Sequence, residues 1–174
     1  QAKTLFPYTT LFRSSTVSRG EFLTGKLAPY VAISALNIVL LWLLATLLFG
    51  VPFKGNFAFF LAASLIYVIC TTGIGLLVSV LVGTQVAAMI VTAIVTVIPA
   101  VLYSGVLIPI PSLGPSAQII AHLLPAMYYT NIVVGCFLKG VGLVALWQDV
   151  LVLAGYAVLL FGTGFVMFSK RPAA

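Results

Sequence analysis

The sequence predicts an all-α membrane protein, a polytopic bundle of four transmembrane helices with a short re-entrant helical hairpin before the last span. Of its 174 residues, 63% are hydrophobic and only 6% are charged, and the mean hydropathy is +1.27. A soluble domain carries about a quarter charged residues, so this chain could not cover a surface that faces water. Four apolar stretches also reach the length of about 20 residues that a helix needs to cross a bilayer.

The predicted spans follow one another closely along the chain. They cover about residues 27–49, 58–82, 86–108 and 146–168. Asp149, near the start of the last stretch, is the one ionisable Asp, Glu, Lys, Arg or His side chain in them. The links at residues 50–56 and 83–85 are short and contain Gly, so neighbouring spans are expected to be antiparallel. Pro99 predicts a kink in the third span.

The first residues are expected not to be native protein. Residues 4–14 read TLFPYTTLFRS, which resembles the translation of a common short-read sequencing adapter. We therefore treat residues 1–14 as a non-native segment, the alternative being an amphipathic lead-in helix. Residues 15–26 are expected to form a cytoplasmic connecting segment and residues 27–171 a transmembrane domain. On this interpretation the natural protein extends further toward its N-terminus.

The cations predict the orientation of the chain in the membrane. Those before the first span and after the last are Arg19, Lys26, Lys170 and Arg171, whereas Lys54 and Lys139 belong to the opposite side. Because Lys and Arg are enriched in cytoplasmic segments, both ends of the chain are expected to be cytoplasmic. The net charge of +6 is scattered over span ends and forms no patch, so no nucleic-acid partner is predicted.

A second kind of element is predicted between the third and fourth spans. Pro115 and Pro125 each fit the first turn of a short helix, where a missing N–H costs nothing. Both helices would be apolar but too short to span, which is typical of a re-entrant or interfacial hairpin, here at about residues 112–138. Tyr128, Tyr129 and Trp147 are residue types found at headgroup level.

Candidate sites of packing and transport lie inside the predicted spans. Thr71, Gly75, Ser79 and Gly83 recur every four residues, a pattern of small side chains that lets a second helix approach closely. A surface facing the substrate is the alternative interpretation of these four residues. Asn37 is the most polar side chain of the first span and a candidate for the translocation path.

The sequence carries no catalytic, cofactor-binding or metal site. Gly20 to Lys26 match seven positions of the phosphate-binding loop GxxxxGK[ST], but Leu27 stands where the hydroxyl residue is required. Cys70 and Cys136 are isolated in apolar surroundings and are interpreted as small buried hydrophobes. His122 and Asp149 lie at span boundaries, so a proton-carrying pair is not expected.

Two segments resemble a known family. The stretch VSRGEFLTGKLAPY before the first span is similar to the end of the cytoplasmic connecting segment of type-2 ABC transporter permeases (ABC-2 type export permeases). The segment before the last span is similar to the corresponding stretch of that family through an ordered series of motifs. These are Ser104-Gly105, spaced prolines, Gln118, Pro125-x-x-Tyr128 and Leu138-Lys-Gly-x-Gly-Leu143. The resemblance covers residues 15–171.

The resemblance implies a function and a set of site residues. The permease of this family has six spans, of which these four would be the third to the sixth. A separate cytoplasmic ATPase subunit would bind ATP and magnesium, so this chain would bind no cofactor. Arg19, Glu21 and Lys26 would couple to that ATPase. Pro115, Gln118, Pro125 and Tyr128 would belong to the outer gate.

The resemblance also implies an assembly, a membrane and a class of cargo. Two permease subunits would pair within the lipid of a prokaryotic cytoplasmic (inner) membrane, with multidrug efflux as the family-level default. The cargo would be lipid-like, a polysaccharide or drug-like. Spans without charges argue against ion coupling, since such transporters place ionisable groups or broken helices at a midplane site. The alternatives are a transporter or channel that is not ATP-driven, and a membrane-embedded enzyme or anchor.

Overall fold

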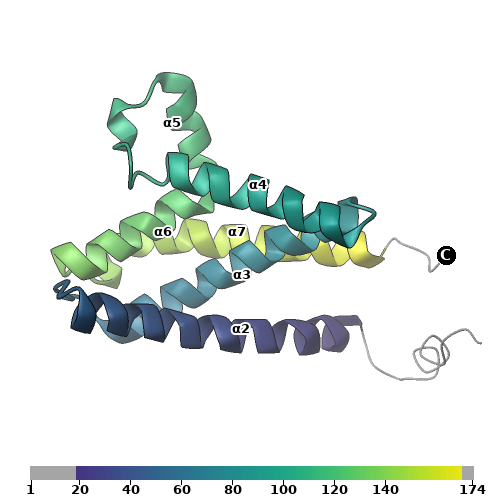
Figure 1. Ribbon diagram of the computed structural model, residues 1–174, viewed down its shortest axis with the longest axis horizontal. Coiled ribbons are helices and arrows are strands. Elements are labelled where there is room, and N and C mark those ends of the chain that lie inside the picture. The colour runs from purple at the N-terminus through teal and green to yellow at the C-terminus, as the bar shows by residue number, and fades with distance from the viewer. Residues whose placement is uncertain (1–18, 170–174) are drawn as a thin grey trace, which may run out of the picture.

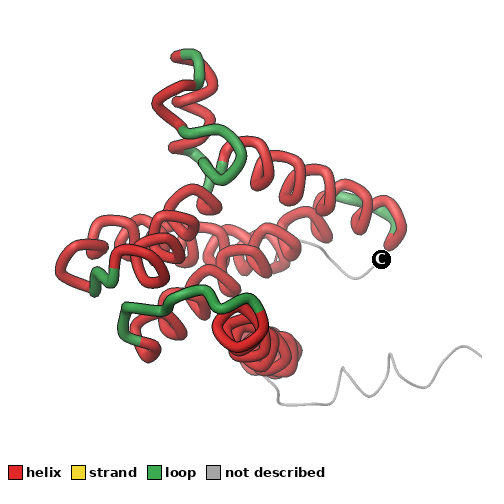
Figure 2. The backbone as a smooth tube through the Cα atoms, turned by 60° about the vertical axis from the view of Figure 1, so that its left-hand side comes forward, coloured by secondary structure: helices red, strands yellow, loops and turns green. Residues whose placement is uncertain are grey.

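The computed structural model describes residues 19–169, and all regular secondary structure in that range is helical (Figures 1 and 2). Four helices are long and apolar enough to cross a membrane: Ala28–Leu48, Phe57–Ser79, Gln85–Tyr103 and Leu143–Thr163. The predicted all-α fold with four candidate spans is therefore confirmed. The segment predicted to be non-native, residues 1–14, and the cations Lys170 and Arg171 lie outside the described residues.

The helices follow the order predicted from hydropathy. The long ones are α2 (Arg19–Leu43), which continues into the π-helical turn η1 (Leu44–Leu48), α3 (Phe57–Leu81), α4 (Gln85–Tyr103) and α7 (Leu143–Ser169). The short ones between α4 and α7 are η2 (Ile110–Ser112), α5 (Pro115–His122), α6 (Pro125–Val134) and the π-helical turn η3 (Gly135–Lys139).

Local chemistry explains where several helices begin. The Oδ1 atom of Asn56 accepts hydrogen bonds from the N–H groups of Ala58 at 2.8 Å and Phe59 at 3.2 Å, which caps the start of α3. Thr84 caps α4 in the same way through the N–H of Ala87. Pro115 and Pro125 occupy the first positions of α5 and α6, as predicted.

The third long helix ends earlier than hydropathy predicts. It stops at Tyr103 instead of near residue 108, and Gly105 then adopts a φ of +85°. That conformation is open to glycine and strained for other residues, so it turns the chain away from the helix axis. Residues 106–108 keep the apolar composition of a span but form part of the connection to η2.

The core of the bundle lies between α3, α6 and α7. Its buried side chains include Phe60 and Cys70 of α3, Ile132 of α6 and Leu153 of α7. Figure 1 shows α2 on one side of this group and α4 on the other. No residue of α4 is buried, and the described parts of both flanking helices expose many apolar side chains.

Close contact between α3 and α7 runs through Cys70 and Gly73. The Cys70 thiol donates a hydrogen bond to the carbonyl oxygen of Leu153 at 3.1 Å. A Cβ atom added at Gly73 would lie 3.1 Å from the Cβ of Leu160, so only glycine fits without a shift. At Gly75 and Gly83 an added Cβ would meet no atom within 4 Å. The ridge predicted at Thr71, Gly75, Ser79 and Gly83 is thus not the contact between α3 and α7, and its packing role stays a prediction.

The links at one end of the bundle are packed against each other. Gly140 has a φ of +67°, and a Cβ there would lie 2.9 Å from the Cβ of Lys54. Rings from four segments (α2, the link at residues 50–56, α3 and η3) pack together here: Trp42, Phe53, Phe57, Phe60 and Phe137. Residues 50–56 and 139–142 therefore share one end, which we call the Lys54 end. The turn between α3 and α4 lies at the other end, with the start of α2, which we call the Arg19 end (Figure 1).

Candidate functional site

The segment between α4 and α7 contains a sharply bent pair of helices. The segments Pro115–His122 and Pro125–Lys139 meet at 81°, and together they have the length and composition of a broken span or a re-entrant loop. In Figure 1, α5 stands away from the bundle while α6 lies within it. The hairpin predicted at residues 112–138 is present as these two helices.

Two tyrosines hold the bend at the end of α5. The last carbonyl groups of a helix have no partner within the helix and need one elsewhere. The hydroxyl of Tyr128 on α6 donates to the carbonyl oxygen of His122 at 2.9 Å, and the hydroxyl of Tyr156 on α7 donates to that of Leu123 at 3.0 Å. Tyr128, predicted as a gate residue, therefore ties α5 to α6, and Tyr156 ties the bend to a long helix.

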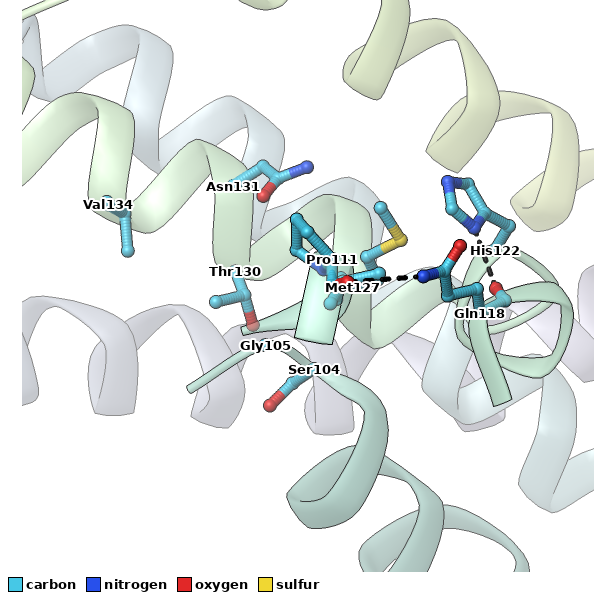
Figure 3. Close-up of a pocket in the computed structure, with 10 residues that line it drawn as sticks. Ser104, Gly105, Pro111, Gln118, His122, Met127, Thr130, Asn131 and Val134 are labelled. Carbon is cyan, nitrogen blue, oxygen red and sulfur yellow. Dashed lines mark hydrogen bonds between the residues drawn. The ribbon is translucent and has the colours of Figure 1, made fainter. Parts of the chain in front are cut away.

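A pocket of about 560 Å³ opens beside this bend, between the end of α4, η2, α5 and α6 (Figure 3). We call it the α4–α6 pocket. Its lining combines apolar and polar side chains: Ser104, Gly105, Ile110, Pro111, Gln118, His122, Met127, Thr130, Asn131 and Val134. Of the predicted gate residues, Gln118 lines this pocket. Pro115 lines a second, more open hollow along α5 that shares Gln118 and His122 with this pocket, and Pro125 is buried.

Hydrogen bonds fix the orientation of two polar side chains in the pocket. The Nε2 atom of Gln118 donates to the carbonyl oxygens of Leu113 at 2.9 Å and Pro111 at 3.4 Å. The Nδ1 atom of His122 lies 2.7 Å from the carbonyl oxygen of Gln118. A carbonyl oxygen only accepts hydrogen bonds, so this nitrogen carries the proton. The donor groups of both side chains are thus hydrogen-bonded to backbone carbonyl oxygens.

Asn131 connects the pocket to Asp149. Its Nδ2 atom donates to the Oδ1 atom of Asp149 on α7 at 3.3 Å. The sequence predicts no proton-carrying pair of His122 and Asp149, and the hydrogen-bond partner of Asp149 in the structure is Asn131. The carboxylate of Asp149 therefore lies behind the pocket wall, one side chain away from the cavity.

A second cleft of about 440 Å³ lies between α3 and α4. It contains Thr71 of the predicted ridge, and its lining is Tyr67, Thr71, Thr72, Thr92, Thr96, Val97, Ala100 and Val101. Hydroxyls here bond to their own helices: Thr71 and Thr72 donate to the carbonyl oxygen of Val68, at 3.0 and 2.7 Å. Such bonds leave the methyl groups as the main contact surface, so this cleft is chemically less selective than the α4–α6 pocket.

Two groups of predicted site residues remain, Asn37 and the coupling candidates near the start of α2. Asn37 is exposed on α2 and lines neither cavity. Arg19, Glu21 and Lys26 fall in the first turns of α2, and their side chains lie outside what the structure describes. Their coupling role stays a prediction. Within residues 19–169, no group of three or more His, Cys, Asp or Glu side chains could hold a metal ion.

Sequence reasoning missed several residues that the structure brings together. Thr130 and Asn131 were not singled out, nor was Tyr156, and Ser104 was named only as part of a family motif. The adjacent polar pair Thr130-Asn131 inside an otherwise apolar run was a usable signal, because an unpaired amide is costly in an apolar environment. Thr92 and Thr96, four residues apart, similarly marked one face of α4.

Known proteins resemble this chain over nearly its whole length. A family model described as ABC-2 family transporter protein matches residues 9–166. The probable multidrug ABC transporter permease YbhS of Escherichia coli (strain K12) is 28% identical over 158 residues, which cover 91% of this chain and 42% of that protein. The probable multidrug ABC transporter permease YbhR of the same strain is 25% identical over 157 residues, 90% of this chain and 42% of that protein. The chain therefore spans less than half the length of these relatives. No solved structure matches it significantly.

Proposed function

The chain belongs to the ABC-2 family of transporter proteins, and from this premise we propose that it forms part of the translocation path of an ATP-driven exporter. One observation carries the proposal: four apolar helices that each suit a membrane span belong to a chain that matches the permease family almost end to end. The names of both relatives describe probable permeases of multidrug ABC transporters. The proposed cargo is lipid-like, a polysaccharide or drug-like.

Charge placement supports an energy source outside the membrane. Asp149 near the start of α7 is the one acidic or basic side chain in the predicted spans, and it is hydrogen-bonded by Asn131 at the edge of the α4–α6 pocket. Transporters driven by ions place such groups along the path itself. We therefore assign energy input to a cytoplasmic ABC ATPase subunit, which would bind ATP and magnesium in place of this chain.

The proposed assembly contains a second permease subunit. α2 and α4 expose apolar side chains, among them Leu36 at 68% and Met89 at 73%. Lipid, other spans of the permease and a second subunit are the surfaces that such side chains can contact in a membrane. The proposal places the complex in the inner membrane of a prokaryote.

Orientation follows from the cations. With Arg19 and Lys26 on the cytoplasmic side, the Arg19 end faces the ATPase and the Lys54 end faces outward. The bent pair α5–α6 then belongs to the outer half of the path, where it would form the outer gate. Pro115, Gln118, Pro125 and Tyr128 would shape that gate.

A test of ATPase coupling uses charge reversal at the start of α2. The variants Arg19→Glu and Glu21→Lys in the permease that carries this chain should lower the ATPase activity that the permease stimulates in its partner. Lys139→Glu, at the Lys54 end, is the matched control and should leave that stimulation unchanged. Equal effects at both ends, or no stimulation by the unmodified permease, would contradict the proposed coupling. Cargo movement without any ATPase would instead favour the channel alternative.

A further inference from the structure

The α4–α6 pocket presents hydrogen-bond acceptors on side chains whose orientation is fixed by hydrogen bonds of their own N–H groups. The Nε2 atom of Gln118 is bonded to the loop carbonyls, so its Oε1 atom is the free end of the amide. Reversing this amide would place two oxygens together, which excludes the alternative orientation. Figure 3 shows the Oε1 atom turned away from Pro111.

Hydrogen bonds orient His122 and Asn131 in the same way, with one of the two N–H groups of Asn131 bonded to Asp149. Because Nδ1 of His122 donates to the carbonyl oxygen of Gln118, the neutral ring offers a lone pair on Nε2. Because Nδ2 of Asn131 donates to Asp149, the Oδ1 atom of Asn131 is its free acceptor. Three side chains on two helices therefore supply acceptor atoms around one cavity.

Charge near the pocket favours a positive ligand. None of the lining residues is a Lys, Arg, Asp or Glu, and the carboxylate of Asp149 lies directly behind Asn131. That carboxylate adds negative potential on this side of the pocket. A positive group would gain from both this potential and the acceptor atoms, whereas an anionic group would be repelled by the same carboxylate.

The rest of the lining suits an apolar body. Ile110, Met127 and Val134 face the same cavity, and Met fits irregular shapes well because its side chain is flexible. The volume of about 560 Å³ lies within the range of roughly 300–1,000 Å³ that is usual for small-molecule sites.

We propose that the α4–α6 pocket binds amphiphiles through a protonated amine, whose N–H groups donate to Gln118 Oε1 and His122 Nε2, which lie together in Figure 3, while Asn131 Oδ1 offers a separate acceptor further along the lining. The apolar body of the ligand lies against Ile110, Met127 and Val134. This inference rests on the proposed export function, since it names the class of cargo that the outer part of the path recognises.

The test compares two ligands that differ only in the amine. The probes are dansylcadaverine, a primary alkylamine with an apolar fluorophore, and its N-acetyl derivative, which lacks the positive charge. Binding to the permease in lipid nanodiscs is followed by fluorescence polarisation, without ATP or the ATPase. Because hydrogen bonds to charged groups contribute about 1.5–3 kcal/mol, the amine should bind about tenfold or more tightly than its acetyl derivative.

Variants assign the selectivity to the pocket. Gln118→Leu should remove most of the preference for the amine and leave the acetyl derivative bound within about twofold. Gln118→Lys keeps donors for the carbonyl oxygens of Leu113 and Pro111 but replaces the acceptor with a cation. It should therefore fold and bind the amine more weakly than the unmodified protein. Gln148→Leu, which removes an exposed amide of α7 outside the pocket, is the matched control.

Several results would overturn the assignment. Equal affinity of the two probes for the unmodified permease would do so, as would a preference for the amine that survives both Gln118 variants. Loss of the preference in Gln148→Leu would place the site elsewhere. The binding site and the export function can be refuted independently. Selective binding without ATP-driven transport would support the site and refute the export proposal. ATP-driven transport without selective binding would support export and refute the site.

Discussion

Single side chains decide how closely α3 and α7 pack. Gly73 faces Leu160, and only 3.1 Å separates the Leu160 Cβ from the place that a Cβ on residue 73 would take. Gly75, two residues further on, faces open space in the described chain. The sequence marks both as small residues in an apolar run, and nothing in their spacing tells which of them lies at the contact. That distinction depends on the rotation of α3 about its axis, which the partner helix sets.

Substitutions at Gly73 and Gly75 should differ in their effect on stability, because only Gly73 lies at the contact between α3 and α7. Gly73→Leu should force α3 and α7 apart and destabilise the permease by about 1–3 kcal/mol, the usual cost of overpacking. The measurement is the midpoint of thermal unfolding in mild detergent, with Gly75→Leu as the matched control. A drop for Gly75→Leu that equals or exceeds the drop for Gly73→Leu would contradict the packing described for α3 and α7.

At the scale of elements, hydropathy predicts the long helices well and their ends less well. The starts of α5 and α6 could also be predicted, because Pro115 and Pro125 fix the first position of each helix. The end of α4 could not, since residues 106–108 are as apolar as the helix before them and only Gly105 turns the chain. The α4–α6 pocket was missed for a different reason. Its polar atoms come from several different segments of the chain. Only the folded structure shows which of their N–H groups are hydrogen-bonded and which acceptor atoms face the pocket.

The bend between α5 and α6 should depend on its two tyrosine hydroxyls. Tyr156→Phe removes the donor to the Leu123 carbonyl oxygen, and one such hydrogen bond contributes about 1 kcal/mol, or about fivefold in a local opening equilibrium. Hydrogen exchange in residues 115–124 should accelerate accordingly. Tyr67→Phe is the control, because it removes a hydroxyl of α3 and keeps the ring stacked on Tyr129. Unchanged exchange in Tyr156→Phe would show that other contacts hold the bend.

For the whole molecule, the distribution of cations predicts which end faces out. Labelling of introduced cysteines tests that prediction, because the two cysteines of the chain are buried and give little background. Cys70 and Cys136 are free and 0% exposed, so they should react slowly with thiol reagents. Lys139→Cys places a thiol at the Lys54 end, and Gln85→Cys places one at the Arg19 end, both at exposed positions. An impermeant maleimide should label Lys139→Cys in intact cells and Gln85→Cys only after permeabilisation. The reverse pattern would invert the proposed orientation.

The central claim is that a chain with almost no charge in its spans depends on an ATPase for its energy, and transport in proteoliposomes tests it most directly. The permease that carries this chain is reconstituted with its ATPase partner, and accumulation of a fluorescent amphiphile is measured with ATP, with a non-hydrolysable analogue, and with an ion gradient alone. We predict accumulation with ATP only, and its loss when the phosphate-binding lysine of the ATPase is replaced. Accumulation driven by the ion gradient, or persisting with the inactive ATPase, would contradict the account.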